Sequence, residues 1–151
     1  MADQKPAPPS ALAHLAIAVD SLDAAKALYL ALGFSPHEPE TIAREKVRAL
    51  CVEKDGLRIE LLEACPPGEG PIAKFISKRG PGLNHLALQS SNLAADLQAL
   101  AAAGVKVLPG YPAVGMGGMH VAFLDPKTTG GVLIELVASP IAPSIGTSGP
   151  A

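Results

Sequence analysis

The chain has 151 residues, of which 48% are hydrophobic, and its 12 Lys and Arg residues nearly balance its 14 Asp and Glu residues. A chain of this length can bury a core without disulfides or a structural metal, so we expect one globular domain. The formal net charge is −2 and only 3% of the residues are aromatic. This composition lacks the cationic surface and the stacking platforms that nucleic-acid binding needs, so no nucleic-acid partner is expected.

Both ends of the chain have the composition of loose tails, rich in Pro, Gly, Ser and Ala. We predict a disordered N-terminal tail at 1–10, a single domain at 11–138 and a flexible C-terminal tail at 139–151. The first residues lack the features of a signal or transit peptide, and no apolar run approaches about 18 residues, so a cytoplasmic protein without a membrane partner is expected. Cys51 and Cys65 lie in or beside apolar stretches without CxxC spacing, which favours reduced, buried thiols.

The chain contains an internal repeat. Residues 14–17 (HLAI) return 71 positions later as residues 85–88 (HLAL). Self-similarity of this kind indicates two copies of one structural unit. We predict units at 11–64 and 82–138, joined by a linker at 65–81 whose first residues, rich in Pro and Gly, interrupt regular structure.

Each unit begins with the same predicted elements. A short apolar strand that contains His is followed by Ser21 in the first unit and by Asn92 in the second, and both residue types favour the N-cap of a helix. Helices are then expected at 22–32 and 93–103, each ended by a glycine at the next position.

Each unit also ends with similar strands. Residues 57–62 (LRIELL) resemble residues 132–137 (VLIELV), and the Asp55-Gly56 pair before the first of these predicts a hairpin turn. Further strands are predicted at 47–53, 106–108 and 120–124. The order of strand, helix and three strands in each unit predicts an α+β fold.

One His and one Glu in each unit interrupt an apolar strand. An ionised Glu135 in the run 132–138 costs several kcal/mol of desolvation unless it has a partner. Glu60 is its equivalent in the first unit, and His14 and His85 are equivalent to each other. A pseudo-twofold axis between the units would bring these four side chains together, and two imidazoles with two carboxylates are typical of a site for Co, Mn, Ni, Zn or Fe(II).

Other chemically active residues have weaker patterns. Arg58 beside Glu60 leaves open an exposed strand face in place of a metal ligand. His37 and His120 have no partner in the repeat and are expected on the surface or in loops. The glycine-rich segment 115–119 is expected to be a mobile loop that covers a pocket.

These features resemble the vicinal oxygen chelate superfamily, which includes glyoxalase I and the extradiol dioxygenases, and within it the methylmalonyl-CoA epimerase family. The resemblance rests on residues 14–19 (HLAIAV), 58–63 (RIELLE), 71–75 (PIAKF), 82–87 (GLNHLA) and 123–136 (FLDPKTTGGVLIEL). It implies two paired βαβββ modules around a U-shaped cavity with one divalent metal ion, most often cobalt in epimerases, with manganese, nickel or zinc as alternatives. It also implies a homodimer that binds an acyl-CoA substrate.

The resemblance implies a role for each of the four converging residues. His14, Glu60, His85 and Glu135 would be the metal ligands, and Glu135 would also be one of two bases that remove the α-proton. The reaction would interconvert (R)- and (S)-methylmalonyl-CoA through a metal-stabilised enolate.

The second base departs from the family pattern. Many epimerases carry it three residues before the valine that corresponds to Val47, where this chain has Arg44. Glu45 is the candidate here, provided that the local backbone turns it inward, because a shift of one residue in a strand moves a side chain to the other face. A surface salt bridge of Glu45 is the alternative.

A second departure lies in the glycine-rich turn, where Gly117 and Met119 stand in place of the His and Lys that relatives often have. Lys74 and Lys127 are candidates for contacts with CoA phosphates, although isolated lysines are more often surface residues. Two other functions remain open: a glyoxalase I-type lactoylglutathione lyase, and a metal-free small-molecule-binding protein of the same superfamily. The long C-terminal segment favours the epimerase over the lyase, and the full set of four ligand-type residues favours an enzyme over the binding protein.

Overall fold

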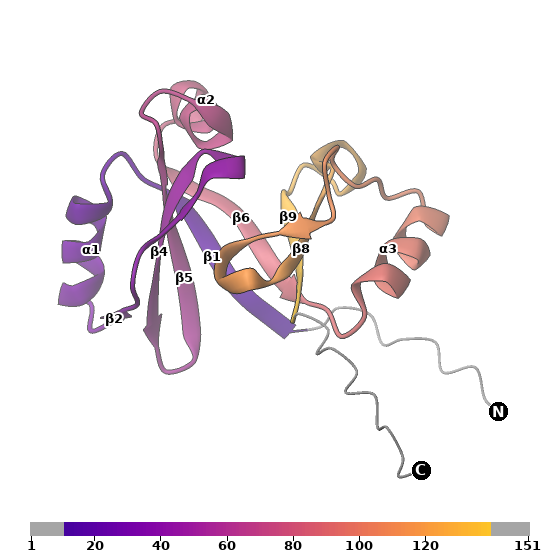
Figure 1. Ribbon diagram of the computed structural model, residues 1–151, viewed down its shortest axis with the longest axis horizontal. Coiled ribbons are helices and arrows are strands. Elements are labelled where there is room, and N and C mark those ends of the chain that lie inside the picture. The colour runs from indigo at the N-terminus through magenta and orange to yellow at the C-terminus, as the bar shows by residue number, and fades with distance from the viewer. Residues whose placement is uncertain (1–10, 140–151) are drawn as a thin grey trace, which may run out of the picture.

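The computed structural model describes residues 11–139, so both predicted tails lie outside the described residues, apart from residue 139 (Figure 1). The first unit consists of β1 (Ala11–Ala18), α1 (Leu22–Ala31), β2 (Ser35–Pro36), β3 (Glu40–Ile42), the 3-10 helix η1 (Ala43–Glu45), β4 (Val47–Lys54) and β5 (Leu57–Ala64). After α2 (Gly70–Arg79), the second unit consists of β6 (Gly82–Gln89), α3 (Leu93–Ala102), β7 (Ala113–Val114), η2 (Met116–Gly118), β8 (His120–Leu124), η3 (Pro126–Thr128) and β9 (Ile134–Ala138).

Within residues 11–139, nine strands form one mixed sheet, with the order β2-β4-β5-β1-β6-β9-β8-β7 and with β3 paired to β4. The two equivalent strands β1 and β6 pair antiparallel at the centre, where His14 lies opposite Ala87 and Ala16 lies opposite His85. The repeat converts one of these pairs into the other, so a pseudo-twofold axis passes between the two strands. The α+β fold of two paired units is confirmed (Figure 1).

The outer neighbours of the central pair follow the same symmetry. β1 runs parallel to β5 with Ala16 beside Glu60, and β6 runs parallel to β9 with Ala87 beside Glu135. Because side chains alternate between the two faces of a strand, His14 and Glu60 lie on the same face as their equivalents from the second unit. The sheet register therefore brings all four polar side chains to one face near the axis.

The local signals for helix and turn ends are confirmed. The side-chain oxygens of Ser21 and Asn92 each accept a hydrogen bond from the backbone N–H three residues later. The helices α1 and α3 begin directly after these two capping residues. Gly33, with φ of 90°, follows the first helix in the left-handed region that favours glycine. Asp55 and Gly56 both have positive φ, 50° and 81°, as a type I′ hairpin turn requires.

Two elements differ from the sequence-based expectations. The predicted strand at 106–108 is a single bridge between Val107 and Leu124. The predicted linker contains α2, a helix favoured by Pro71 in its first turn and by basic residues in its last turn. The Pro- and Gly-rich residues before this helix led to the prediction of a linker, so the helix was missed. No helix in residues 11–139 is long and apolar enough to cross a membrane.

The two faces of the first half of the sheet have different coverings. The face away from the polar site packs against α1, through a cluster that includes Leu22, Leu50 and Leu61. The face that carries His14 and Glu60 is closed at one end by α2, whose Ile72 packs with Ala16, Ala18 and Leu62. Because the strand residues under α2 are mostly small, the helix can approach the sheet closely and form one end wall of the space above the site.

A buried polar pair joins α3 to the end of β6. Ser90 and Asp96 are 5% and 4% exposed, and the Ser90 hydroxyl donates a hydrogen bond to the Asp96 carboxylate. We expect Ser90→Ala to lower the free energy of unfolding by about 1–3 kcal/mol, because a buried acceptor that loses its donor keeps its full desolvation cost. Urea denaturation followed by circular dichroism measures the change. The exposed neighbour variant Ser91→Ala should stay within about 0.5 kcal/mol of the native protein, and equal losses in both variants would contradict this role for the pair.

Candidate functional site

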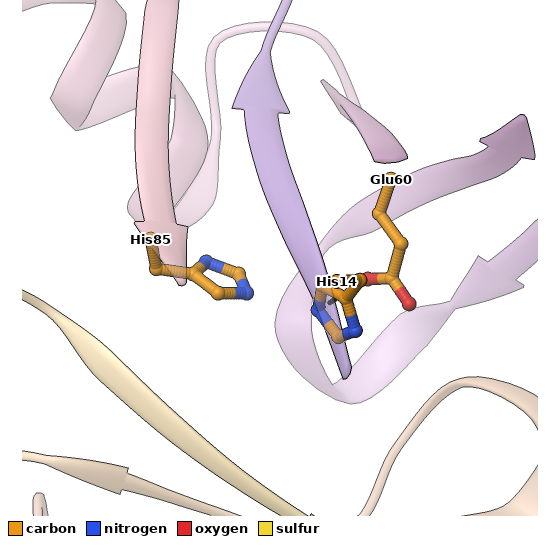
Figure 2. Close-up of side chains that lie close together, drawn as sticks. All are labelled: His14, Glu60 and His85. Carbon is orange, nitrogen blue, oxygen red and sulfur yellow. Dashed lines mark ion pairs between the residues drawn. The ribbon is translucent and has the colours of Figure 1, made fainter. Parts of the chain in front are cut away.

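The two histidines and two glutamates converge on the four central strands. His14 Nε2 lies 3.2 Å from both Glu60 Oε2 and Glu135 Oε2, and His85 Nε2 lies 2.8 Å from Glu135 Oε2. Figure 2 shows the ring of His85 on β6 pointing toward His14 on β1, with Glu60 beside His14. The ligand-type atoms of His14, Glu60 and His85 all lie within 4.8 Å of one another. The structure therefore brings together the residues that the repeat predicted to converge.

The two buried carboxyl groups have pKa values shifted in opposite directions. Burial alone raises the pKa of Glu135, but the imidazoles of His14 and His85 outweigh it and hold this pKa at about 2. Burial dominates at Glu60 and raises the pKa of that carboxyl group above its usual value. Burial lowers the pKa of His14, whereas the Glu135 and Glu60 carboxylates raise it, with a net increase. Glu135 is thus held ionised between two imidazoles.

The donor set fits a divalent metal ion. His14 Nε2 is buried, yet no residue of the described chain is oriented to form a hydrogen bond with it. The distances between nitrogen and oxygen atoms, 2.8 to 3.2 Å, match the spacing of about 3 Å between neighbouring ligand atoms around an octahedral ion with bonds of about 2.1 Å. Two imidazole nitrogens with carboxylate oxygens suit borderline and hard divalent ions.

A neighbouring amide orients one imidazole. His85 Nδ1 lies 2.8 Å from Asn84 Oδ1, so a hydrogen on Nδ1 donates to the amide oxygen and leaves Nε2 to face Glu135. Outer partners of this kind fix the tautomer and ring orientation of a ligating histidine. Asn84 had no predicted role, although a polar amide next to a histidine in an apolar strand is a signal that could have identified it.

The site opens into a cavity of about 730 Å³. A second cavity of about 720 Å³ lies on the α2 side, and both are lined by Glu45 and His85. Lys74, Lys78 and Arg79 of α2 line the second cavity together with apolar side chains such as Phe75. The polar site thus lies where two hollows meet, one of them cationic.

Glu45 faces this region because of an irregular backbone. Residues Ala43–Glu45 form the 3-10 helix η1, and Lys46 follows in the left-handed conformation with φ of 54°. Glu45 is half-buried, lines both cavities, and accepts a hydrogen bond of 3.1 Å from the Tyr111 hydroxyl. Burial raises the pKa of Glu45, and the Tyr111 hydrogen bond opposes this increase. The inward turn that the sequence analysis required of Glu45 is present.

The neighbouring Arg44 turns to a different group. Its guanidinium donates to the Gly110 carbonyl oxygen and lies 4.9 Å from the centre of the Tyr111 ring. Arg44 therefore contacts the segment that holds Tyr111. The Tyr111 contact with Glu45 spans 66 residues and had no signal in the sequence.

The glycine-rich segment lies across the first cavity. Met116, Gly117 and Met119 line it, and the Gly117 N–H donates to Glu40 Oε2 at 2.9 Å, which joins the second unit to the first. The segment thus forms part of the cavity wall, whereas its mobility and its role as a cover stay predictions.

The remaining histidines and sulfur groups follow the expectations in part. His37 is exposed and lies 3.1 Å from Glu53, although it also lines the first cavity. His120 begins β8 and so lies on a strand. Cys51 and Cys65 are both free thiols; the first is buried, whereas the second is partly exposed.

The two candidate CoA-binding lysines are placed differently. Lys74 lines the second cavity. Lys127 lies in η3, outside the lining of both cavities, and its backbone N–H donates a hydrogen bond to the side chain of the N-cap residue Asp125. Only Lys74 is therefore positioned beside the site.

Comparisons with known proteins identify relatives over most of the chain. A sequence model of the glyoxalase/bleomycin resistance protein/dioxygenase superfamily matches residues 13–123. The chain is 38% identical over 129 residues to an ethylmalonyl-CoA/methylmalonyl-CoA epimerase of Cereibacter sphaeroides, covering 83% of this chain and 95% of the relative. The crystal structure of methylmalonyl-CoA epimerase from Mycobacterium tuberculosis is 31% identical with a TM-score of 0.81, covering 93% of each chain.

A third similar protein was solved with a ligand. A Streptomyces coelicolor methylmalonyl-CoA epimerase variant in complex with 2-nitronate-propionyl-CoA is 31% identical with a TM-score of 0.80, covering 88% of this chain and 96% of that one. The similarity in sequence and in fold thus extends over both units.

Proposed function

Because this chain belongs to the glyoxalase/bleomycin resistance protein/dioxygenase superfamily and, within it, to the methylmalonyl-CoA epimerase family, we propose that it is a divalent-metal-dependent epimerase that interconverts (R)- and (S)-methylmalonyl-CoA. One observation carries the proposal: two imidazole nitrogens and two carboxylate oxygens converge in a buried site, and a third carboxylate, Glu45, lines the same cavity. This set of groups suits the removal of a proton from a carbon atom beside a carbonyl group.

The chemistry of the substrate explains the need for these groups. The α-carbon of methylmalonyl-CoA lies between a thioester and a carboxylate, so loss of its proton places negative charge on carbonyl oxygens. A divalent cation held by His14, His85, Glu60 and Glu135 would act as a Lewis acid that stabilises this charge as an enolate. Inversion at the α-carbon then needs one base on each face.

Two carboxylates supply these bases in the proposal. Glu135 Oε2 lies within 2.8 Å of His85 Nε2 and stays ionised, so it can accept a proton on one face. Glu45 reaches the cavity from η1 and is the base for the other face. For each epimer, one carboxylate removes the α-proton on its own face, and the other, in its protonated form, delivers a proton to the opposite face and so forms the other epimer.

The two cavities suit a substrate with a small acyl group and a long carrier. The acyl group would lie beside the four converging side chains, and the CoA portion would extend into the second cavity. There, apolar side chains suit the pantetheine chain, and Lys74, Lys78 and Arg79 suit the phosphates. The structure of a relative with a CoA analogue supports an acyl-CoA substrate.

The proposal extends to the metal and the assembly. Cobalt(II) is the proposed ion, as the resemblance implies, and manganese, nickel and zinc accept the same nitrogen and oxygen donors. We also propose that the protein is a homodimer and that it acts in the cytoplasm.

The direct test is proton exchange with solvent. Purified protein, stripped with a chelator and then reloaded with cobalt(II), should incorporate deuterium at the α-carbon of (S)-methylmalonyl-CoA in deuterated water and form the (R)-epimer. The stripped protein should lose this activity, because the developing charge is no longer stabilised. NMR of the α-position measures both processes.

Other results of this test would decide against the proposal. Absence of exchange with cobalt, manganese, nickel and zinc would remove the epimerase. Turnover of methylglyoxal with glutathione by the same preparation would favour the lyase, and undiminished ligand binding in chelator would favour the metal-free binding protein.

A further inference from the structure

We propose that Tyr111 is a positioning residue that holds Glu45 in place for proton transfer on one face of the substrate, and that Arg44 supports Tyr111 in this role. The inference rests on the proposed epimerase function, and adds residues to which neither the sequence pattern nor the comparisons assign a role.

The contact between Tyr111 and Glu45 joins the two units. The Tyr111 hydroxyl donates to Glu45 Oε1 at 3.1 Å, from the loop before β7 of the second unit to η1 of the first. A carboxylate on the last residue of a short 3-10 helix lacks the regular hydrogen-bond ladder of a strand to fix its position. A hydrogen bond to one oxygen restrains the side chain and leaves the other oxygen available.

The Tyr111 ring is itself held on two sides. It packs edge-on against Phe123, with ring centroids 5.0 Å apart, and Phe123 packs in the same way at 5.0 Å against the imidazole of His85. The opposite contact comes from Arg44, whose guanidinium lies 4.9 Å from the ring centre and donates to the Gly110 carbonyl oxygen. The aromatic contacts therefore connect the candidate base to the central site through packed rings.

The backbone at Gly110 lies close against the Arg44 guanidinium. Its φ is 86°, in the region that favours glycine, and a Cβ atom at this position would lie 2.9 Å from Arg44 Nη2. Arg44 thus has a specific place in this fold. It supports the tyrosine that holds the neighbouring carboxylate.

Tyr111 acts as a donor and not as a base. Burial, together with the adjacent Glu45 carboxylate, raises the pKa of Tyr111 to about 12, so the phenol stays protonated over the working range of an enzyme. A protonated phenol can donate to the Glu45 carboxylate but cannot remove a proton from the substrate. The charged and titratable groups that face Glu45 are Arg44 on its own helix, Tyr111, His85 and Glu135.

The test compares the two epimers separately. Initial rates of α-proton loss from (R)- and from (S)-methylmalonyl-CoA are measured in deuterated water for the metal-loaded enzyme. Tyr111→Phe keeps the ring against Phe123 and removes only the hydroxyl. We expect it to slow proton loss about tenfold from one epimer, the same one that Glu45→Gln affects, and to change the rate for the other epimer less than about twofold.

The chain offers a matched control in its only other tyrosine. Tyr29 lies on α1 and packs edge-on against Phe34 at 5.5 Å, on the opposite face of the sheet. Tyr29→Phe should leave both rates unchanged. Arg44→Met should reproduce the selectivity of Tyr111→Phe to a smaller degree, and it serves as a second variant if Tyr111→Phe folds poorly.

A second readout is the pKa of Glu45, followed both by kinetics and by a titration that does not depend on turnover. The hydrogen bond from Tyr111 lowers the pKa of Glu45, so its removal should raise that pKa. Since a base acts in its ionised form, the acid limb of the kcat/KM profile for the affected epimer should move to higher pH. The titration of the Glu45 side-chain carboxyl carbon, followed by NMR, should move in the same direction.

Equal slowing of both epimers, or no change in either, would overturn the positioning role. If the unmodified enzyme exchanges no α-proton with any metal, the proposed function itself fails. If it epimerises and Tyr111→Phe does not separate the epimers, only this inference fails.

Discussion

Glu135→Gln should abolish epimerisation, with a loss of at least about 10³-fold in kcat, and should weaken metal binding in the same variant. The first effect follows because removal of a general base alone costs about 10²–10⁴-fold. The second follows because the loss of an outer partner of a ligand already costs about 10–100-fold in metal affinity, and Glu135 lies among the candidate ligands themselves. Titration with cobalt(II), together with the deuterium assay, measures both losses.

An exposed pair of the same residue types provides the control. Glu53 lies 3.1 Å from His37, and the two side chains are 38% and 47% exposed, whereas those of Glu135 and His85 are 8% and 4% exposed. Glu53→Gln should therefore leave metal affinity and activity close to the native values. A Glu135→Gln variant with native cobalt affinity would show that this carboxylate is not a ligand, and one with native turnover would show that it is not a base.

Glu45→Gln should separate proton exchange from inversion. With one base removed, the remaining Glu135 carboxylate can still take the α-proton from one epimer and return a deuteron to the same face. We expect epimerisation to fall by about 10²–10⁴-fold, while one epimer continues to gain deuterium without inversion and the other loses its exchange. NMR of each epimer in deuterated water distinguishes deuterium exchange from inversion.

The matched control is another acidic residue of the same cavity. Glu38 is exposed and lines the first cavity, so Glu38→Gln removes one negative charge from the cavity wall. Both epimers should keep their rates in this variant. If Glu45→Gln instead slows exchange of both epimers to the same extent, or neither, a different group is the second base.

Features that depend on residues close together in the sequence were predicted correctly. Ser21 and Asn92 cap the two helices, and Asp55-Gly56 forms the hairpin turn, because each feature is set by the backbone preferences of a few adjacent residues. The helix α2 is the exception, because the Pro- and Gly-rich residues before it concealed the signal of Pro71.

The convergence of the four polar residues on one site was also predictable from the sequence, for a different reason. Two similar segments adopt similar structures, and the antiparallel pairing of β1 with β6 is the symmetric way to join them. A buried Glu135 needs a partner whatever the details of the fold, so the histidines that the repeat relates, His14 and His85, were the natural candidates. Their roles as metal ligands and bases stay predictions until the variants are measured.

The sequence by itself determined the repeat, the helix ends, the hairpin and the identity of the four polar residues, because these follow from local backbone preferences and from the cost of burying charge. The tertiary structure alone decided that Tyr111 reaches Glu45, that Arg44 turns to Gly110, and that Gly117 meets Glu40. Each of these contacts joins residues more than 60 positions apart, on irregular segments that the repeat does not relate. Their meeting depends on how far the sheet curves and where the loops cross it, and those are properties of the whole packed chain.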